Sequence, residues 1–496
     1  MKKWILGIGL ATLTLVNVNA QSKKALGTKF STTESVKQKP SMVIGSHEGT
    51  TYAYRKKGAV IYYIPFGVKD VLVKKKKGKV VKEVVLDKKN DKFKRKTYAM
   101  PELIQVGENL VEIAKNENKS TGKTTYYGVS YDKNLKESKP EKLFVKKFTK
   151  NSGDQLFNVS DEERIVFFDI TSTGSRKTEV KIYECDADLE LNEISSYSVR
   201  ASTEEFDITR VLLSEDYVSF IEIEKDEDNV LKSSQFKRFN LKNGKSIEFE
   251  LDFDEINEDI SNYSFSVEED VLAVSGFYES NFSEDNYGGA FTMTYDITSN
   301  EVIKVSKKAF TFDFITSDYS ERASKRAAKR ADKGKSFDNY SYIMDRVIAN
   351  EDGSSYIIGQ KYRYYVTTTT TSNGGTRSVP HYVYSDILVV KADRDGEIEW
   401  VNKYDRYTST TNDNSGGLIV HKSRSDLSIV CVTSDGLHMK QIDRESGKEE
   451  SDDVFSYKEL DKHGIMINNT EKIDETTFKV NLVRFKKQKV LTIEFS

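Results

Sequence analysis

Four short segments between residues 262 and 310 decide the fold: NYSFSVEED (262–270), VLAVSGFYE (271–279), AFTMTYDI (290–297) and VIKVSKKAF (302–310). In each segment apolar and polar residues alternate, which is typical of a half-buried β-strand. Acidic, Gly or Asn residues separate the segments, as tight turns require. The stretch therefore predicts one antiparallel sheet of four strands.

The same unit recurs toward the C-terminus. Residues 341–404 contain SYIMDRVIANEDG, SSYIIGQKYRYY, SDILVVKADRDG and EIEWVNKY, in which EDG and RDG supply the Asp and Gly that tight turns favour. Residues 416–447 repeat the rhythm as GGLIVHKSRSD, LSIVCVTSDG and LHMKQIDRESG. These copies indicate an internal repeat of four-stranded sheets.

The period of the repeat predicts the architecture. The first strands of the units begin near residues 51, 98, 153, 205, 260, 341, 417 and 464, and most spacings are close to 50 residues. Two longer spacings each hold an insertion, a helix at 312–338 and a long hairpin at 363–386. Four strands at such a period are typical of a β-propeller. We expect an all-β propeller, with eight blades favoured over seven, one inserted basic helix and one long β-hairpin.

Closure of the ring needs one strand from the other end of the chain. The last unit, from residue 464, ends after three strands, and SMVIGSHE (41–48) is the segment expected to supply the fourth. The rival architecture is a row of immunoglobulin-like sandwiches, with about seven strands per hundred residues and linkers between domains. No such linkers are evident, so the propeller is favoured.

The N-terminus predicts export. MKKWILGIGLATLTLVNVNA (1–20) has two early lysines, an apolar stretch and a small residue before the expected cut at Gln21, which is the pattern of a cleavable signal peptide. The apolar run is shorter than the roughly 20 residues of a spanning helix. Residues 21–40 form a polar lead-in and 41–496 the propeller. The two cysteines, Cys185 and Cys431, are expected as small buried groups in strands.

Three segments resemble a known group of proteins. These are SDILVVKADRDGEIEWVNKYDR (385–406), SSYIIGQKY (354–362) and ERASKRAAKRADKGK (321–335). They resemble secreted, largely uncharacterised β-propeller proteins of Bacteroidota, and the match is sharp from Ser317 to Arg406. The resemblance implies an exported propeller and carries no catalytic residue.

Catalytic and metal-binding patterns are incomplete. Three Gly-Lys-Thr/Ser triplets lack the upstream glycine of a phosphate-binding loop, and the acidic clusters, such as Asp393 to Gly396, lack the distal ligands of an EF-hand. The five histidines lack the spacing of metal ligands: His47, His381, His421, His438 and His463. We therefore predict no catalytic residues, no metal and no cofactor.

Charge is unevenly distributed along the chain. Residues 21–150 carry 31 Lys and Arg against 13 Asp and Glu, whereas residues 151–310 carry 15 against 36. Residues 311–496 are nearly balanced, with 28 against 29. In a ring this predicts a basic sector from units one and two that faces an acidic sector from units three to five, and the two sectors would steer charged partners or orient the disk. Export and the acidic half argue against nucleic acid as a partner.

The two insertions supply the candidate partner-binding residues. Asp318 and Glu321 are expected to cap the helix, and Gly334 to end it. Helical spacing places its cations on one face and its alanines on another. The hairpin, turning at 373–375, is rich in tyrosine, which is enriched at protein interfaces. The candidates are Arg322, Arg326, Lys329, Arg330 and Lys333 on the helix, and Tyr362, Tyr364, Tyr365, Tyr382 and Tyr384 on the hairpin.

Three functions stay open from the sequence. The first is a non-enzymatic exported propeller that binds another envelope protein, as an accessory subunit of an outer-membrane or periplasmic assembly without a transmembrane span of its own. The second is a module that binds a glycan or an anionic envelope surface. The third is a hydrolase or lyase whose carboxylates come from several blades.

Overall fold

The computed structural model describes most of the chain from Lys24 to Phe495. The residues outside the description are 1–23, 26–27, 37–41, 48–49, 62–63, 77–78, 87–101, 119, 148–154, 162, 175, 227–230, 255, 257–258, 280–287, 334–339, 351, 353, 371–374, 412–414, 461–462, 473–475, 485–486 and 496. The predicted signal peptide, Gly334 and the first residues of the predicted hairpin turn thus lie outside the described residues.

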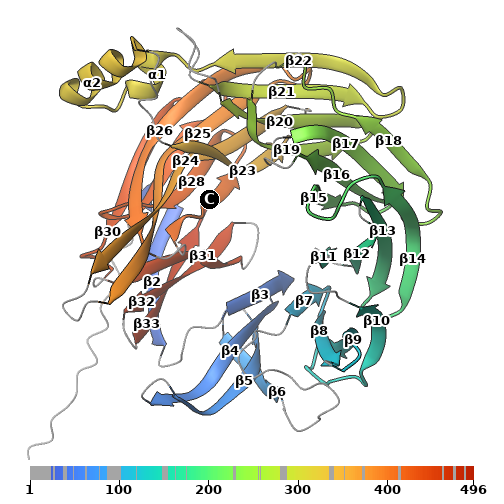
Figure 1. The fold of residues 1–496 in the computed structure, drawn as a ribbon. Helices are drawn as coiled ribbons and strands as arrows, with labels where there is room; N and C mark the ends of the chain where they lie inside the picture. The colour runs from blue at the N-terminus through green and yellow to red at the C-terminus, as the bar shows by residue number, and fades with distance from the viewer. Residues whose placement is uncertain are drawn as a thin grey trace, which may run out of the picture.

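Eight antiparallel sheets stand side by side around a ring (Figure 1). Seven have four strands and one has five. The first three sheets contain β3 (Met42–His47), β4 (Thr50–Ile61), β5 (Ile64–Lys76) and β6 (Lys79–Leu86); β7 (Glu102–Val106), β8 (Asn109–Asn118), β9 (Lys123–Tyr131) and β10 (Glu141–Lys147); and β11 (Gln155–Ser160), β12 (Arg164–Gly174), β13 (Lys177–Asp186) and β14 (Leu191–Val199).

The remaining sheets continue the series in chain order. They contain β15 (Phe206–Leu213), β16 (Tyr217–Lys225), β17 (Leu231–Asn240) and β18 (Ser246–Glu250); β19 (Asp259–Glu268), β20 (Val271–Glu279), β21 (Gly289–Asp296) and β22 (Glu301–Ala309); β23 (Ser341–Ala349), β24 (Ser355–Thr370), β25 (Thr376–Ala392) and β26 (Ile398–Thr410); β27 (Ile419–Lys422), β28 (Asp426–Val432), β29 (Gly436–Asp443) and β30 (Glu449–Ser456); and β31 (Gly464–Lys472), β32 (Thr477–Arg484), β33 (Lys487–Glu494), β2 (Thr28–Val36) and β1 (Lys24–Ala25).

The core lies between the sheets. The middle strands β21 and β28 are buried along almost their whole length, because each sheet packs a neighbour on both faces. The outer strand β22 is exposed at most positions. Apolar clusters fill the seven interfaces between consecutive sheets. In one of them Phe220 stacks on Phe239 and meets Phe168 edge to face. The prediction of an all-β propeller is confirmed, with eight blades rather than seven.

The last sheet is completed from the N-terminus, but not by the predicted segment. Strand β2 pairs antiparallel with β33, and β31 contacts β3 of the first sheet. The prediction that SMVIGSHE performs this pairing is wrong, because that segment forms β3, the inner strand of the first sheet. The expected polar lead-in instead contributes β1 and β2. An alternating pattern alone does not reveal which distant strand is its partner.

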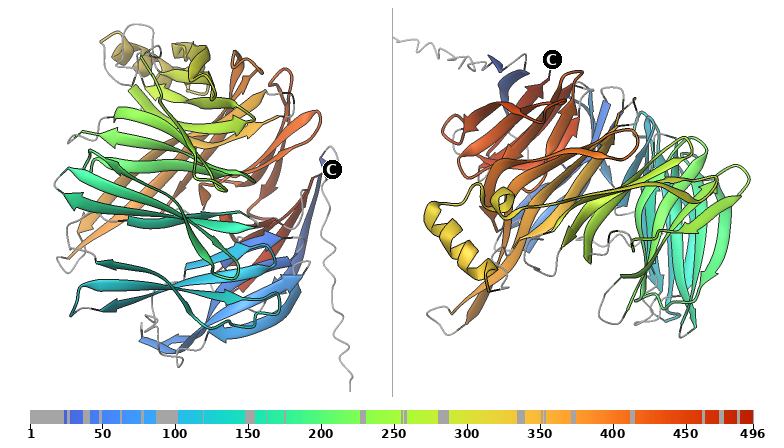
Figure 2. Two further views of the ribbon diagram at one scale, coloured as in Figure 1. Left: turned by 90° about the vertical axis from the view of Figure 1, so that its right-hand side faces the viewer. Right: turned by 90° about the horizontal axis from the view of Figure 1, so that it is seen from above.

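Both predicted insertions are present. The helical insert between β22 and β23 contains α1 (Phe312–Thr316) and α2 (Glu321–Ala331). Ser320 caps α2 by accepting from the Ala323 N–H at 3.4 Å, so the prediction of Asp318 as the cap is wrong. Asp318 contacts Lys403 instead. The long hairpin is formed by β24 and β25, which extend past the rest of their sheet (Figure 2, right).

Candidate interaction surface

The helical insert and the hairpin belong to one sector of the ring. The insert leads directly into the sheet β23–β26, and the hairpin is the extension of that sheet's two middle strands. In the right-hand view of Figure 2, α2 and the extended parts of β24 and β25 lie at the same side of the molecule. We refer to the exposed face of α2 and the extended part of the hairpin together as the candidate surface.

Helix α2 presents its cations to solvent. Ala327 is buried, whereas the four predicted cations within the helix are exposed, as the helical spacing predicted: Arg322, Arg326, Lys329 and Arg330. Lys333 is exposed too, but it lies beyond the end of α2. Lys325 is also exposed and lies 2.5 Å from Glu321, one turn away. Lys325 is not among the residues predicted from the sequence, although its spacing of four residues from Glu321 is the signal for such a pair. Basic residues in the last turn also suit the negative end of the helix dipole.

The hairpin tyrosines divide between two faces. Tyr362 and Tyr384 pair across the strands with ring centroids 5.2 Å apart, and Tyr364 pairs with Tyr382 at 5.3 Å. Tyr365 lies on the other face, where its ring stacks on His381 at 4.7 Å. The tyrosines therefore pair across the strands and stabilise the ribbon.

The tyrosines differ in their availability to a partner. Tyr364 is 52% exposed, whereas Tyr384 is only 5% exposed. The Tyr384 ring packs against Gly416, and the Arg406 guanidinium lies over it at 5.3 Å. Tyr384 is thus buried against the loop to the next sheet. This burial does not support the prediction that Tyr384 contacts a partner.

Arg406 fixes the base of the hairpin to the next sheet. It is buried on β26 and donates to Gln360 of β24 and, at 2.8 Å, to the carbonyl oxygen of Ser415. It also donates to the carbonyl oxygen of Val432 on β28 at 3.2 Å. Burial lowers the pKa of Arg406. The backbone carbonyl groups that accept its hydrogen bonds compensate for the lost hydration of the guanidinium group.

A buried ionic cluster joins the insert to the hairpin. The Asp386 carboxylate on β25 lies 3.4 Å from the Lys361 ammonium group on β24 and 3.8 Å from that of Lys403 on β26. Lys403 also donates to the Asp318 carboxylate and, at 3.0 Å, to the carbonyl oxygen of Ile315. Burial raises the pKa of Asp386, and the two lysines oppose that rise. The cluster thus links the segment before α2 to the base of the hairpin.

A polar cleft of about 510 Å³ lies between β26 and the sheet β27–β30. Within it Lys440 is buried between Glu449 at 3.2 Å and Asp452 at 2.8 Å. The cleft is lined by Asn402, Lys403, Tyr404, Asp405, Lys440, Ser446, Gly447, Lys448, Glu449 and Asp452. These residues come from two blades, so no local sequence pattern could have revealed the cleft.

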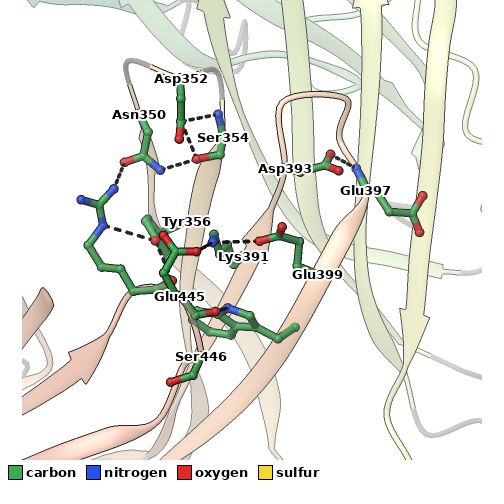
Figure 3. Close-up of polar contacts among 12 residues, drawn as sticks. Asn350, Asp352, Ser354, Tyr356, Lys391, Asp393, Glu397, Glu399, Glu445 and Ser446 are labelled. Atoms are coloured by element: carbon green, nitrogen blue, oxygen red, sulfur yellow. Dashed lines mark hydrogen bonds and ion pairs between the residues drawn. The ribbon is translucent and has the colours of Figure 1, made fainter. Parts of the chain in front are cut away.

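Figure 3 shows a network of polar contacts, here called the clamp, between the sheets β23–β26 and β27–β30. Arg444 donates to Asn350 at 3.0 Å and to the Tyr356 hydroxyl at 3.3 Å. Lys391 lies 2.9 Å from both Glu399 and Glu445. Both cations have their partners within this region, two carboxylates for Lys391 and neutral acceptors for Arg444, which indicates a structural role.

Histidines and acidic loops do not assemble into a metal site in the described part of the chain. His381 stacks on the hairpin, His421 stacks on Phe495, and His438 lies between Asp435 and Asp452. Asp393 of the predicted acidic turn accepts from the backbone N–H groups of Asp395 and Glu397. None of the helices in the described residues is long and apolar enough to span a bilayer.

Comparison with known proteins finds likeness in structure only. No family model and no curated protein matches the chain. The WD40 domain of SCAP from fission yeast is similar with 8% identity and a TM-score of 0.42, over 94% of each chain. Sqt1 of Saccharomyces cerevisiae has 10% identity and a TM-score of 0.41, over 91% of this chain and 95% of its own.

A third similar structure is the β-propeller domain of the Trilobed protease from Pyrococcus furiosus. It has 10% identity and a TM-score of 0.36, over 80% of this chain and 95% of that chain. At such identities the likeness concerns the fold alone, and no ligand or activity of this chain follows from it.

Proposed function

We propose that this protein is an exported, non-enzymatic propeller that binds another protein of the cell envelope through the candidate surface. In this role it serves as an accessory subunit of a periplasmic or outer-membrane assembly. The observation that carries the proposal is the ionic cluster of Lys361, Asp386 and Lys403 with Asp318, which fixes a basic helix and an aromatic ribbon relative to each other. A rigid surface of this kind loses little conformational entropy when it binds.

The charge of the surface indicates the chemistry of the partner. Residues 321–333 carry six Lys and Arg against Glu321 and Asp332, and the cations of α2 are exposed. An acidic partner surface complements this charge and speeds association at low salt. Tyr364 on the hairpin is about half exposed. It supplies an aromatic side chain of the type that contributes most to the binding energy of protein interfaces.

The test is affinity capture from the native envelope fraction, with cross-linking to locate the contact. The variant R322E/R326E/K329E reverses three exposed charges on α2. The matched control K139E/K142E/K147E reverses three exposed charges on β10 and the loop before it. We expect a partner that cross-links to α2 or the hairpin, and a loss of at least about tenfold in its capture by the helix variant only. Equal capture by both variants would overturn the proposal.

Export has its own test. Mass spectrometry of the protein isolated from its native cells should give a chain that begins at Gln21, in the envelope fraction. A chain that retains residues 1–20 in the cytosol would contradict the proposed location.

A further inference from the structure

The hairpin carries an open strand edge. Strand β23 pairs with β24 only as far as Tyr362, and β26 pairs with β25 only from Tyr382 onward. Beyond those points six cross-strand pairs, from Tyr365–His381 to Thr370–Thr376, have no further strand beside them within the described residues. This ribbon is roughly 20 Å long at the rise of an antiparallel strand. Its outer N–H and C=O groups are positioned to pair with another chain.

The edge of β24 lacks the features that normally prevent such pairing. Proteins protect edges with lysine, proline, a bulge or a very short strand. The segment Tyr364–Thr370 reads YYVTTTT, which has no charge and no proline and consists of residues with high β-propensity. The register shift of β24 lies before it, at Gln360/Lys361. The edge of β25 differs, because it contains Pro380 and Arg377.

We propose that the β24 edge binds a second copy of this chain, by antiparallel pairing of Tyr364–Thr370 with the same segment across a two-fold axis. The product is a four-stranded sheet in the order β25, β24, β24 of the second copy, β25 of the second copy. Because the strands run antiparallel, the two rings extend from opposite ends of this sheet. A two-fold contact of this type closes after two copies.

Side-chain chemistry favours this partner. With the axis at Thr367, Tyr365 faces Thr369 and Val366 faces Thr368, which are favourable cross-strand combinations. Val366, 47% exposed in the single chain, thereby gains an apolar contact. Arg363, the only charged residue between Lys361 and Thr370, falls at opposite ends of the two strands, so no like charges meet. The edge is therefore compatible with itself in charge and in shape.

The size of the contact sets the expected strength. Seven residues from each copy bury less surface than the roughly 1,200–2,000 Å² of a standard stable interface. The dimer should therefore depend on concentration, with a Kd on the order of micromolar to millimolar. This contact involves residues of β24 and none of α2. The α2 charge-reversal variant therefore tests envelope capture separately from dimerisation, although both proposals use the hairpin.

Sedimentation velocity of the full mature chain across that concentration range tests the proposal. The variant V366K/T368K places lysines opposite each other in the dimer and should raise the Kd at least about tenfold. The control P380K/S378K adds the same charges at the cross-strand partners of those residues on β25, away from the β24 edge. It should keep the wild-type Kd. A wild type that stays monomeric throughout, or equal weakening by both variants, would overturn the proposal.

A disulfide readout checks the register. Thr367→Cys places two thiols next to the two-fold axis, whereas Thr370→Cys places them roughly 20 Å apart. The native Cys185 and Cys431 are both buried and do not compete. Under mild oxidation we expect a covalent dimer from Thr367→Cys and not from Thr370→Cys. Equal cross-linking of the two variants would contradict the paired edge.

Discussion

The buried ammonium group of Lys403 donates to the carboxylate of Asp318, and this ion pair joins the helical insert to the outer strand of the sheet that carries the hairpin. The Lys403 side chain is only 4% exposed, and it also faces the Asp386 carboxylate. Breaking a buried pair leaves an uncompensated charge, which costs more than the pair itself contributes. Lys403 is therefore expected to be the residue that couples the insert to the ring.

Replacement of Lys403 by methionine should lower the free energy of unfolding by about 2 kcal/mol. This loss is smaller than that expected for an isolated buried ion pair, because Asp386 still has Lys361 as an ion-pair partner. Limited proteolysis should also cleave the insert faster, and chemical denaturation gives the energy. The control Lys325→Met removes an exposed pair with Glu321 and should change stability by no more than about 0.5 kcal/mol. A loss from Lys403→Met as small as that of the control would contradict the coupling.

Gly447 should tolerate alanine poorly. Its φ is +67°, and an added Cβ would collide with Asn402 and Trp400. Backbone strain and overpacking together should destabilise Gly447→Ala by about 2–4 kcal/mol. Gly122 offers a matched control, since its φ is +63° and no heavy atom lies within 4 Å of an added Cβ. Gly122→Ala should cost about 1 kcal/mol, and equal thermal shifts in the two variants would refute the packing argument.

His438 should make stability depend on pH. Burial alone lowers its pKa, but hydrogen bonds and charge from Asp452 and Asp435 outweigh burial and raise it above 6.5. A raised histidine pKa stabilises the fold fully below the unfolded value and loses that effect as pH rises through the folded value. The thermal stability of the wild type relative to His438→Gln should therefore be largest near about pH 5.5 and decline toward about pH 8.5. A difference that grows with pH would contradict this assignment.

Removal of β2 should open the ring. A variant that begins at Lys37 lacks the strand that covers β33, whose Leu491 and Ile493 are fully buried. We expect a loss of at least about 3 kcal/mol in the free energy of unfolding. A variant that begins at Thr28 lacks only β1, which pairs with β2 alone, and should stay close to the wild type. Chemical denaturation of the two variants compares them directly.

Local patterns predicted the repeat far better than its closure. The predicted unit starts near 205, 260, 341 and 464 lie within one residue of β15, β19, β23 and β31. The first start, near 51, falls on β4, because TTYAYR alternates more clearly than the short inner strand β3 before it. Pairing between β2 and β33 depends on the whole ring, and an alternating segment carries no signal for a partner so far along the chain.

The candidate surface was predictable only in part. The cations of α2 follow from helical spacing, which a sequence shows directly. The cluster of Lys361, Asp386 and Lys403 does not, because bulges at Gln360/Lys361 and Ser385/Ile387 set which side of the sheet these residues face. Tyr384 shows the same limit, since its burial comes from Gly416 in the loop to the next sheet.

The pairing of Thr28–Val36 with Lys487–Glu494 also constrains how the protein assembles. Strand β2, which completes the final blade, precedes every other blade along the chain. It can therefore pair only after its partner β33, at the other end of the chain, is present. Successive blades can form in order as the polypeptide becomes available. The pairing of β2 with β33 comes last, and we expect it to be slow because it joins segments that are far apart in the sequence. We therefore expect a folding intermediate in which most blades are formed but β2 and β33 are not yet paired.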